Sequence, residues 1–238
     1  MNQLSNRIDE VLACAYVRGH ALRTGIPALP KALLDKPLDA LTEDEQVQLM
    51  ALGKAEGLKL YRFKNHQDLP RVQMTLGFLY GIMPESLLDV GSGRGVFLFP
   101  FLRHFPDARV TSLDLLPHRV ELLEDVRRGG FSQLTALAQD ITQWDEAPDH
   151  SFDAVTLLEV LEHIPNVEDA IRASVRLART CVVVTVPSKP DNNPEHIHLL
   201  TKDILTDLFH RAGVSKLHFS GVNGHLFMAA WLDPQERT

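Results

Sequence analysis

The sequence has little cysteine, no long apolar run and no excess of positive charge, and each lack excludes a class of protein. Its two cysteines, Cys14 and Cys181, lie in apolar surroundings without metal-binding or redox spacing, as reduced core residues of a cytoplasmic protein do. No apolar stretch approaches the roughly 18 residues of a membrane-spanning helix. The N-terminus lacks the basic start and apolar core of a secretion signal. We expect a cytoplasmic protein without a membrane span.

The charge balance argues against a dedicated duplex-DNA binder, which needs a basic face. The 24 Lys and Arg are outnumbered by 31 Asp and Glu, for a net charge of −7. Residues 1–80 hold ten Lys/Arg and nine Asp/Glu (+1), and the remainder holds 14 and 22 (−8). A negatively charged substrate is therefore expected to meet the N-terminal part, although a solvated helix face explains its basic stretch as well. That stretch comprises Lys59, Tyr61, Arg62, Lys64 and Arg71.

Hydrophobic periodicity predicts helices in the first 80 residues and an α/β domain after them. The expected N-terminal helices cover residues 7–24 behind Asn6 as N-cap, about 43–60 behind a capping box at Thr42, and 70–82. From residue 86 onward, short runs rich in Val and Leu alternate with helical stretches, which indicates a parallel sheet covered on both faces. The expected strands are Leu87–Val90, Val110–Leu113, Leu134–Ala138, Ala154–Leu158 and Cys181–Val186, and the expected helices are Val96–Phe105, Pro117–Arg128, Val167–Ala178 and Thr201–Ala212.

The C-terminal part predicts a hairpin formed by Lys216–Ser220 and His225–Leu232, which ends the sheet. The expected fold class is therefore α/β: a Rossmann-like, seven-stranded, mostly parallel sheet with a C-terminal antiparallel hairpin, plus an N-terminal helical extension. We divide the chain into residues 1–80, a helical lid or substrate segment, and residues 81–238, a ligand-binding domain.

A glycine-rich loop, Gly91-Ser92-Gly93-Arg94-Gly95, joins the first expected strand to the first helix of that domain. Its glycines let the backbone turn sharply and approach a ligand closely. Asp114 ends the next expected strand, 19 residues after Gly95, where a carboxylate can accept hydrogen bonds from both hydroxyls of a ribose. This context predicts a nucleoside ligand.

Two residues distinguish a dinucleotide ligand from an amino acid attached to adenosine. A nicotinamide-type fingerprint needs its third glycine one position later, where Val96 stands. Asp89, just before the loop, would repel phosphates but suits an α-ammonium group. An amino acid attached to adenosine therefore fits better than a dinucleotide, which disfavours a nicotinamide-dependent oxidoreductase.

From Leu87 to Leu232 the chain resembles the class I S-adenosylmethionine-dependent methyltransferases. Asp89–Gly95 resembles the family's first motif, Leu113–Leu115 its acidic ribose motif, Gln139–Ile141 its adenine-contacting segment, and Phe152–Val155 the start of its fourth strand. The resemblance implies methyl transfer from S-adenosylmethionine within residues 81–238. The implied cofactor-binding residues are Asp89, Gly91, Gly93, Gly95, Asp114, Leu115, Asp140, Ile141 and Glu159.

Ionisable side chains crowd the end of the fourth expected strand, in "LLEVLEHIPN". Since ligands of such sheets bind beyond the carboxyl ends of the strands, Glu159 is expected to face the reactive methyl group. If a helical turn follows, Glu162 and His163 lie on the same side. Oxygen and nitrogen donors converging in this way suit a divalent metal.

Further metal ligands are expected from "PEHIHLL", after the fifth strand. His196 and His198 alternate across one residue, so both point to one side of an extended segment. The set suits Mg²⁺, Mn²⁺, Fe²⁺, Co²⁺ or Zn²⁺, and residue types alone do not choose among them. The predicted metal ligands are Glu159, Glu162, His163, His196 and His198.

The same residues are equally compatible with a metal-free site. Glutamate and histidine in this place can cap the following turn and line the cavity, and His196 can anchor the loop before a helix capped by Thr201. His163 or His196 is then the general base. Under either interpretation the predicted catalytic residues are Glu159, His163 and His196.

The Glu-x-x-Glu-His sequence with a later His is similar to two metal-using groups of the superfamily. One methylates the terminal ribose 2′-hydroxyl of small RNAs, and the other methylates catechol-like hydroxyls in ubiquinone synthesis. The RNA enzymes carry a longer His-containing stretch ending in an aromatic-acidic motif, which residues 196–201 lack.

Two missing motifs argue against methylation of nucleic-acid bases. The chain has no Asn/Asp-Pro-Pro-Tyr/Phe for exocyclic amines, and neither cysteine follows a proline to attack a pyrimidine. We predict O-methylation of a small-molecule hydroxyl. The alternatives are an RNA 3′ end as the acceptor, or a non-catalytic regulatory protein that binds S-adenosylmethionine.

Overall fold

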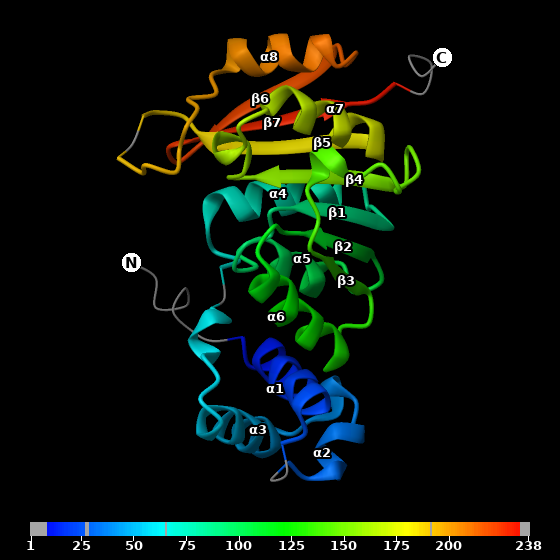
Figure 1. Cartoon of the computed structure of the whole chain (residues 1–238), viewed down its shortest axis with the longest axis vertical. Helices are drawn as coiled ribbons and strands as arrows, with labels where there is room; N and C mark the ends of the chain where they lie inside the picture. Colours follow the sequence, from blue (N-terminus) through cyan, green and yellow to red (C-terminus); the bar gives the residue numbers. More distant parts are fainter. Residues whose placement is uncertain (1–8, 27–28, 65, 191, 234–238) are drawn as a thin grey trace.

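The computed structural model describes residues 9–26, 29–64, 66–190 and 192–233, which are built around one seven-stranded sheet (Figure 1). The strand order is β3-β2-β1-β4-β5-β7-β6. Pairs from β3 to β5 are parallel, and β7 runs antiparallel to both of its neighbours. The predicted α/β class and the C-terminal hairpin are therefore confirmed. The strands are β1 Ser86–Val90, β2 Arg109–Leu113, β3 Leu134–Leu137, β4 Phe152–Leu158, β5 Ala178–Pro187, β6 Lys216–Val222 and β7 His225–Trp231.

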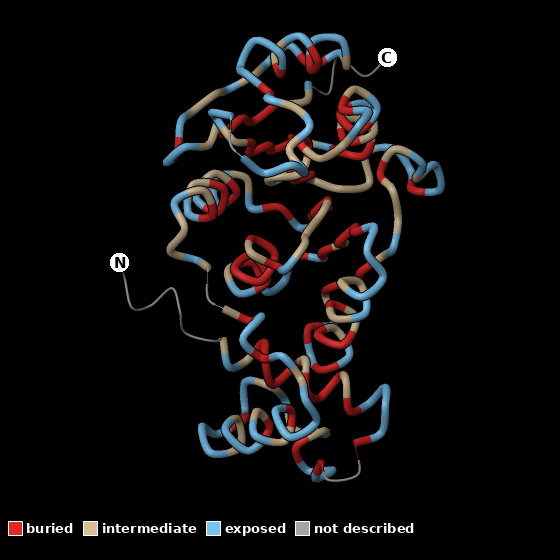
Figure 2. Tube along the Cα trace, turned by 60° about the vertical axis from the view of Figure 1, so that its left-hand side comes forward, coloured by how far each residue is buried: buried red, intermediate tan, exposed pale blue. Residues whose placement is uncertain are grey.

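Helices cover both faces of the sheet and bury one apolar cluster on each. Neighbouring strand residues serve opposite faces: Leu87 belongs to the cluster beneath α4, α5 and α6, and Leu88 to the cluster beneath α7 and α8. This is the two-residue alternation of a strand, and Figure 2 shows the buried chain in red between the helices. The helices are α4 Pro70–Tyr80, α5 Leu98–His104, α6 Pro117–Arg128, α7 Val167–Leu177 and α8 Lys202–Arg211.

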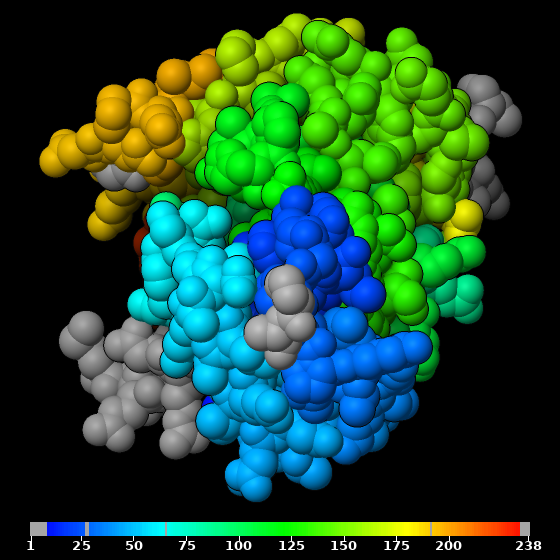
Figure 3. Space-filling view, turned by 60° about the horizontal axis from the view of Figure 1, so that its bottom comes forward, coloured from blue at the N-terminus to red at the C-terminus, as the bar shows by residue number. Residues whose placement is uncertain are grey.

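Of the N-terminal helices, α1 packs on α6, and α3 packs on α1 (Figure 3). Helix α1 crosses α6 at backbone contact, because a Cβ added to Gly19 would lie 1.7 Å from the carbonyl oxygen of Asp125. A Cβ on Gly129 would lie equally close to Ala15 O. Arg23 completes the contact with an ion pair to Asp125 at 2.8 Å. These helices are α1 Glu10–Thr24, α2 Lys31–Asp35 and α3 Glu43–Ala55.

Helix ends in this segment differ from the prediction. The first helix begins at Glu10, not at residue 7, because the Asp9 side chain caps it by accepting the N–H of Leu12 at 3.1 Å; Asn6 lies outside the described residues. The capping box between Thr42 and Glu45 is confirmed, but α3 ends at Ala55. Helix α2 was not predicted, since five residues between prolines give no helical period.

The role of residues 1–80 as a lid or substrate segment stays a prediction. Figure 1 shows α1, α2 and α3 at the end of the molecule beyond α6. The described residues among 1–80 that line cavities at the glycine loop are Tyr61, Arg62, Lys64 and His66, together with Arg71 and Val72 in the first turn of α4. The division at residue 80 stays a prediction, because α1 shares a buried cluster with α4–α6.

The two cysteines lie in the core. Cys14 and Cys181 are both free and buried, and burial raises the pKa of each thiol to about 12. They are core residues, as expected. In the part of the chain that the structure describes, none of the helices has the length and apolar character needed to cross a bilayer.

Candidate functional site

The glycine loop connects β1 to α5 and requires glycine at each of its three glycine positions. Gly91, Gly93 and Gly95 have φ angles of 65°, 58° and 74°, which side-chain-bearing residues rarely adopt. A Cβ on Gly91 would meet Val160 at 2.7 Å, and one on Gly95 would meet the Phe99 ring at 2.4 Å. The loop is therefore packed closely from behind, and its backbone borders a cavity.

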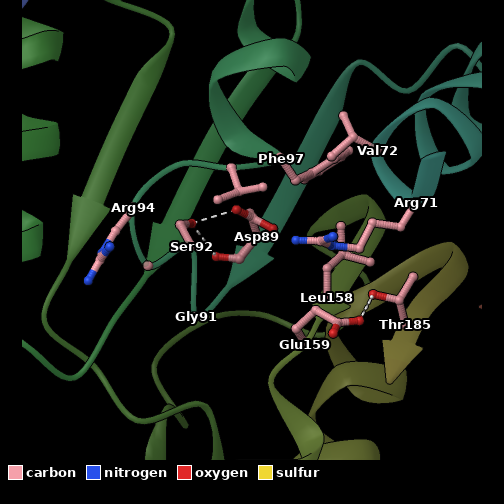
Figure 4. Close-up of a pocket in the computed structure, with 12 residues that line it drawn as sticks. Arg71, Val72, Asp89, Gly91, Ser92, Arg94, Phe97, Leu158, Glu159 and Thr185 are labelled. Carbon is pink, nitrogen blue, oxygen red and sulfur yellow. Dashed lines mark hydrogen bonds between the residues drawn. The ribbon is translucent and has the colours of Figure 1, made fainter. Parts of the chain in front are cut away.

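We call this the first cavity. It has a volume of about 200 Å³ and opens beyond the carboxyl ends of β1, β4 and β5 (Figure 4). In Figure 4 the side chain of Arg71 extends from α4 toward Asp89. Cationic and anionic groups thus face each other across a small space, as an amino-acid ligand would require. The cavity is lined by Arg71, Val72, Asp89, Gly91, Ser92, Gly93, Arg94, Val96, Phe97, Leu158, Glu159 and Thr185.

Asp89 is a buried carboxylate at the floor of this cavity, only 2% exposed. It accepts hydrogen bonds from the hydroxyls of Ser92 at 2.5 Å and Thr156 at 2.7 Å. Burial raises its pKa from 3.8 to about 6, while the two hydroxyls oppose the rise and the charge of Asp114 adds to it. A cation bound beside Asp89 would compensate this lost solvation.

Asp114 follows β2 and is bound by the glycine loop itself. Its Oδ2 accepts the N–H of Gly93 at 3.1 Å and lies 3.3 Å from the Arg119 guanidinium, and its Oδ1 accepts the N–H of Leu116 at 2.9 Å. Only 5% of the residue is exposed. The structure therefore places the predicted ribose-binding carboxylate directly against the loop.

The remaining predicted cofactor residues are Leu115 of the ribose motif, which follows β2, and Asp140 and Ile141, predicted to contact adenine, which follow β3. Leu115 is 66% exposed although it is apolar, which marks a surface that a flat ligand could cover. Asp140 accepts both the N–H and the hydroxyl of Thr142 at 2.9 and 2.8 Å through one oxygen, and Ile141 is buried beside it. These groups lie at the same sheet edge as Asp114, since β2 and β3 are parallel neighbours.

Glu159 follows β4 in a strained conformation with φ of 58°, which costs roughly 1–3 kcal/mol in a residue with a side chain. Its N–H donates to Thr185 O at 2.8 Å, and the Thr185 hydroxyl donates to its Oε1 at 2.8 Å. Its Oε2 lies 2.9 Å from Nδ1 of His225 in the C-terminal hairpin. The carboxylate is thus held at the cavity wall from two directions, as Figure 4 shows for Thr185.

Three of the five predicted metal ligands come together. Donor atoms of Glu162, His163 and His196 all lie within 4.8 Å of one another. Two hydrogen bonds pin the loops that carry them: Ile197 N–H donates to Glu162 O at 2.9 Å, and His163 Nδ1 lies 2.9 Å from Glu195 O. Because a carbonyl oxygen only accepts, His163 Nδ1 carries the proton and Nε2 is left as the ligand atom.

The other two predicted ligands are engaged elsewhere. Leu161–His163 form a 3₁₀ turn rather than an α-helical one, so the spacing argument that put Glu159 on the same side does not apply. His198 does face the loop after β4, but its Nε2 lies 3.1 Å from Ile164 O. The donor set is therefore one carboxylate and two imidazoles. None of these three residues is among those that line the first cavity.

Four residues at the site escaped the sequence reasoning in this role. Thr156 and Thr185 are isolated hydroxyls in otherwise apolar strands, a signal that could have identified them. Arg71 was noticed only as part of a basic stretch. His225 had no signal, because its contact with Glu159 depends on the position of the hairpin beside β5.

Comparison with known proteins places this site in a family context. Residues 88–180 match the family model described as "Methyltransferase domain". The chain is similar to the ubiquinone biosynthesis O-methyltransferase of Vibrio cholerae, with 32% identity over 117 residues, which are 48% of this chain and 46% of that protein. The protein of that name from Xanthomonas oryzae is 36% identical over 96 residues, or 39% and 38% of the two chains. The matched part therefore spans less than half the length of these relatives.

Solved structures agree at the level of the fold. Magnesium protoporphyrin IX methyltransferase from Synechocystis, solved with bound SAH, superposes with a TM-score of 0.56 at 18% identity, over 71% of this chain and 84% of that one. A SAM-dependent methyltransferase from Aquifex aeolicus gives 0.56 at 16%, over 70% and 92%. At these identities the likeness shows a shared Rossmann-like fold.

Proposed function

We propose that this chain is an S-adenosylmethionine-dependent methyltransferase that methylates a hydroxyl group of a small molecule. The family match over residues 88–180 identifies its methyltransferase domain. One observation carries the proposal: Asp89, Asp114 and Glu159 stand at the carboxyl ends of three parallel strands around one glycine loop. Three carboxylates favour a cationic sulfonium nucleoside over a negatively charged dinucleotide.

The residues around the loop would hold each part of the cofactor. The α-ammonium group would bind Asp89, and its carboxylate would bind the Arg71 guanidinium that extends into the cavity. Asp114 would accept the ribose hydroxyls, and Asp140 and Ile141 after β3 would contact adenine. The carboxylate of Glu159, held by Thr185 and His225, would face the sulfonium group.

The reaction is a direct displacement. The acceptor oxygen forms a bond to the methyl carbon while the carbon–sulfur bond breaks and its electron pair returns to sulfur. If no metal binds, the proton of the hydroxyl passes to His163 or His196 as general base; His163 Nε2 can accept it because Nδ1 is committed to Glu195 O. A hydroxyl acceptor is supported by the relatives, which are named for O-methylation in ubiquinone biosynthesis.

The cluster of Glu162, His163 and His196 also fits a divalent metal. One carboxylate and two imidazoles with further positions open form the donor set of many catalytic metal sites. When bound, the metal supplies Lewis-acid chemistry that lowers the pKa of a chelated hydroxyl. The protein orients the donors, because the carbonyl of Glu195 fixes the ring of His163.

Calorimetric titration with S-adenosylhomocysteine tests the cofactor. We expect saturable binding that Asp114→Ala weakens and that Asp145→Ala, an exposed carboxylate away from the cavity, leaves unchanged. Labelled S-adenosylmethionine with a panel of catechols, other hydroxyl compounds and RNA 3′ ends then identifies the acceptor. Binding of NADH in place of the sulfonium nucleoside would refute the proposal. Tight binding without any acceptor, together with a partner protein whose affinity follows the ligand, would favour the regulatory alternative.

A further inference from the structure

We propose that a second cavity beside the glycine loop binds the phosphate group of a small organic phosphate. This second cavity has a volume of about 460 Å³. It lies where the chain between α3 and α4 approaches the first turn of α6, and Figure 3 shows that cyan chain facing the green of α6 across a hollow. The second cavity shares Gly93 and Arg94 with the lining of the first, but its proposed ligand takes no part in the proposed methyl transfer.

The lining of this cavity is strongly basic. It contains Arg62, Lys64, Arg94 and Arg119 together with two histidines, and no Asp or Glu occurs among the described residues that line it. Arg119 is paired with Asp114 at 3.3 Å. In a chain with a net charge of −7, such a concentration of positive charge requires an explanation, and an anionic ligand provides one.

The guanidinium groups of Arg62 and Arg94 are available to that ligand. Within the described ranges, no hydrogen bond or ion pair engages either group. In Figure 4 the side chain of Arg94 points away from Asp89, and the residue lines both cavities. Two planar guanidinium groups offer paired N–H donors that match phosphate oxygens.

Helix α6 adds a further feature that favours an anion. The positive end of a helix is usually accompanied by Asp or Glu, but the first turn of this 12-residue helix has none and carries His118 and Arg119 instead. In this turn Pro117 has no N–H, and the N–H groups of Arg119 and Val120 donate to Leu116 O. The helix therefore favours an anion through its positive end and its basic side chains. The positive surroundings are also felt by His66, whose pKa is lowered by burial and by the charges of Arg71 and Lys64.

The size and the apolar lining of the cavity indicate an organic phosphate rather than a free ion. Small-molecule sites typically measure 300–1,000 Å³, and the second cavity lies within that range. Tyr61, Phe99 and Leu122 line it beside the basic groups, and the Tyr61 residue is 59% exposed. These side chains can cover the organic part of a ligand whose phosphate contacts the arginines.

Calorimetric titration of the full chain with phenyl phosphate, inorganic phosphate and phenol tests this assignment. We expect saturable binding of phenyl phosphate that Arg62→Gln weakens about tenfold or more. Arg62→Lys should be intermediate, because it keeps the charge and loses the planar donors. The matched control is Arg109→Gln, an exposed arginine at the opposite end of the sheet, which should bind like the wild type.

Several results would overturn the assignment. It fails if phenyl phosphate does not bind, if phenol binds equally well, or if Arg62→Gln and Arg109→Gln weaken binding to the same extent. Equal affinities for inorganic phosphate and phenyl phosphate would show that the organic group is not recognised, and would overturn the assignment to an organic phosphate. S-adenosylhomocysteine is titrated separately into Arg62→Gln, where its affinity should be unchanged, so a failure of this site is distinguished from a failure of the methyltransferase proposal. Thermal unfolding confirms that each variant is folded.

Discussion

Replacing Asp89 by Asn should stabilise the ligand-free protein and weaken its affinity for the cofactor. The carboxylate is 2% exposed and has no cation bonded to it in the described structure; its two hydrogen bonds come from the neutral hydroxyls of Ser92 and Thr156. Burial therefore opposes its ionisation. An amide of the same shape keeps both contacts, since each hydroxyl can either donate or accept.

The magnitude follows from the pKa. The value rises from 3.8 to about 6 in the folded protein, and this difference corresponds to about 3 kcal/mol. Because the folded-state pKa is raised, the folded protein binds more protons than the unfolded chain between these values. The stability that protonated Asp89 contributes is complete below the lower pKa and is lost as the pH rises through the higher one.

The assay is urea unfolding of both proteins without ligand, from about pH 4 to pH 8. The free energy of unfolding of Asp89→Asn minus that of the wild type should increase across this window by up to about 3 kcal/mol and then level off. The exposed Asp145→Asn serves as the matched control and should show no such increase. A difference that stays constant with pH, or one that favours the wild type as pH rises, would refute the reasoning.

The same variant should bind S-adenosylhomocysteine more weakly at neutral pH, because the α-ammonium group loses its charged partner. In the wild type the affinity should fall below about pH 6, where Asp89 becomes protonated. In the variant this pH dependence should disappear, which separates the carboxylate from other titrating groups. The residue would then reduce stability in exchange for ligand binding.

Three further predictions concern other parts of the molecule. Gly19→Ala should lower the free energy of unfolding by about 3 kcal/mol, because its Cβ would lie 1.7 Å from a backbone oxygen of α6. The control Gly77→Ala has open space around the added methyl group and should raise the free energy of unfolding by about 1 kcal/mol. Urea unfolding measures both values. Asp114→Asn should weaken S-adenosylhomocysteine about tenfold or more by calorimetry, since a charged acceptor is lost; an unchanged affinity would exclude it from the site. His196→Ala should weaken Mn²⁺ binding about tenfold or more, whereas His198→Ala should leave it unchanged. Equal losses of Mn²⁺ affinity in the two variants would contradict the assignment of His196 as a metal ligand.

Local sequence features were sufficient to predict the sheet and the glycine loop. The alternation of Val- and Leu-rich runs with amphipathic stretches depends on burial of both sheet faces, and Pro117–Arg128 begins and ends where the pattern predicted. Asp89 and Asp114 could be identified because parallel strands bring successive carboxyl ends to one edge. The same rule predicted that the His196 segment lies beside the loop after β4, which the hydrogen bond from Ile197 to Glu162 confirms.

What could not be predicted depends on contacts between distant residues. Glu159 has a left-handed backbone because it is bonded to Thr185, 26 positions away, and spacing within the chain does not reveal this. The surface that buries α1 was also hidden. Amphipathic periodicity indicates that a helix has a buried face but not which element covers it, so the packing of α1 on α6 could not be predicted.

The backbone contact of α1 with α6 bears on how this chain can be recombined with its relatives. Chimeras are usually joined at a presumed domain boundary, which here would fall near residue 80. Such a joint would pair α1 of one parent with α6 of the other, and a residue larger than glycine at position 19 or at position 129 would collide with the backbone of the facing helix. Crossover points placed after residue 130 keep the two glycine contacts within a single parent.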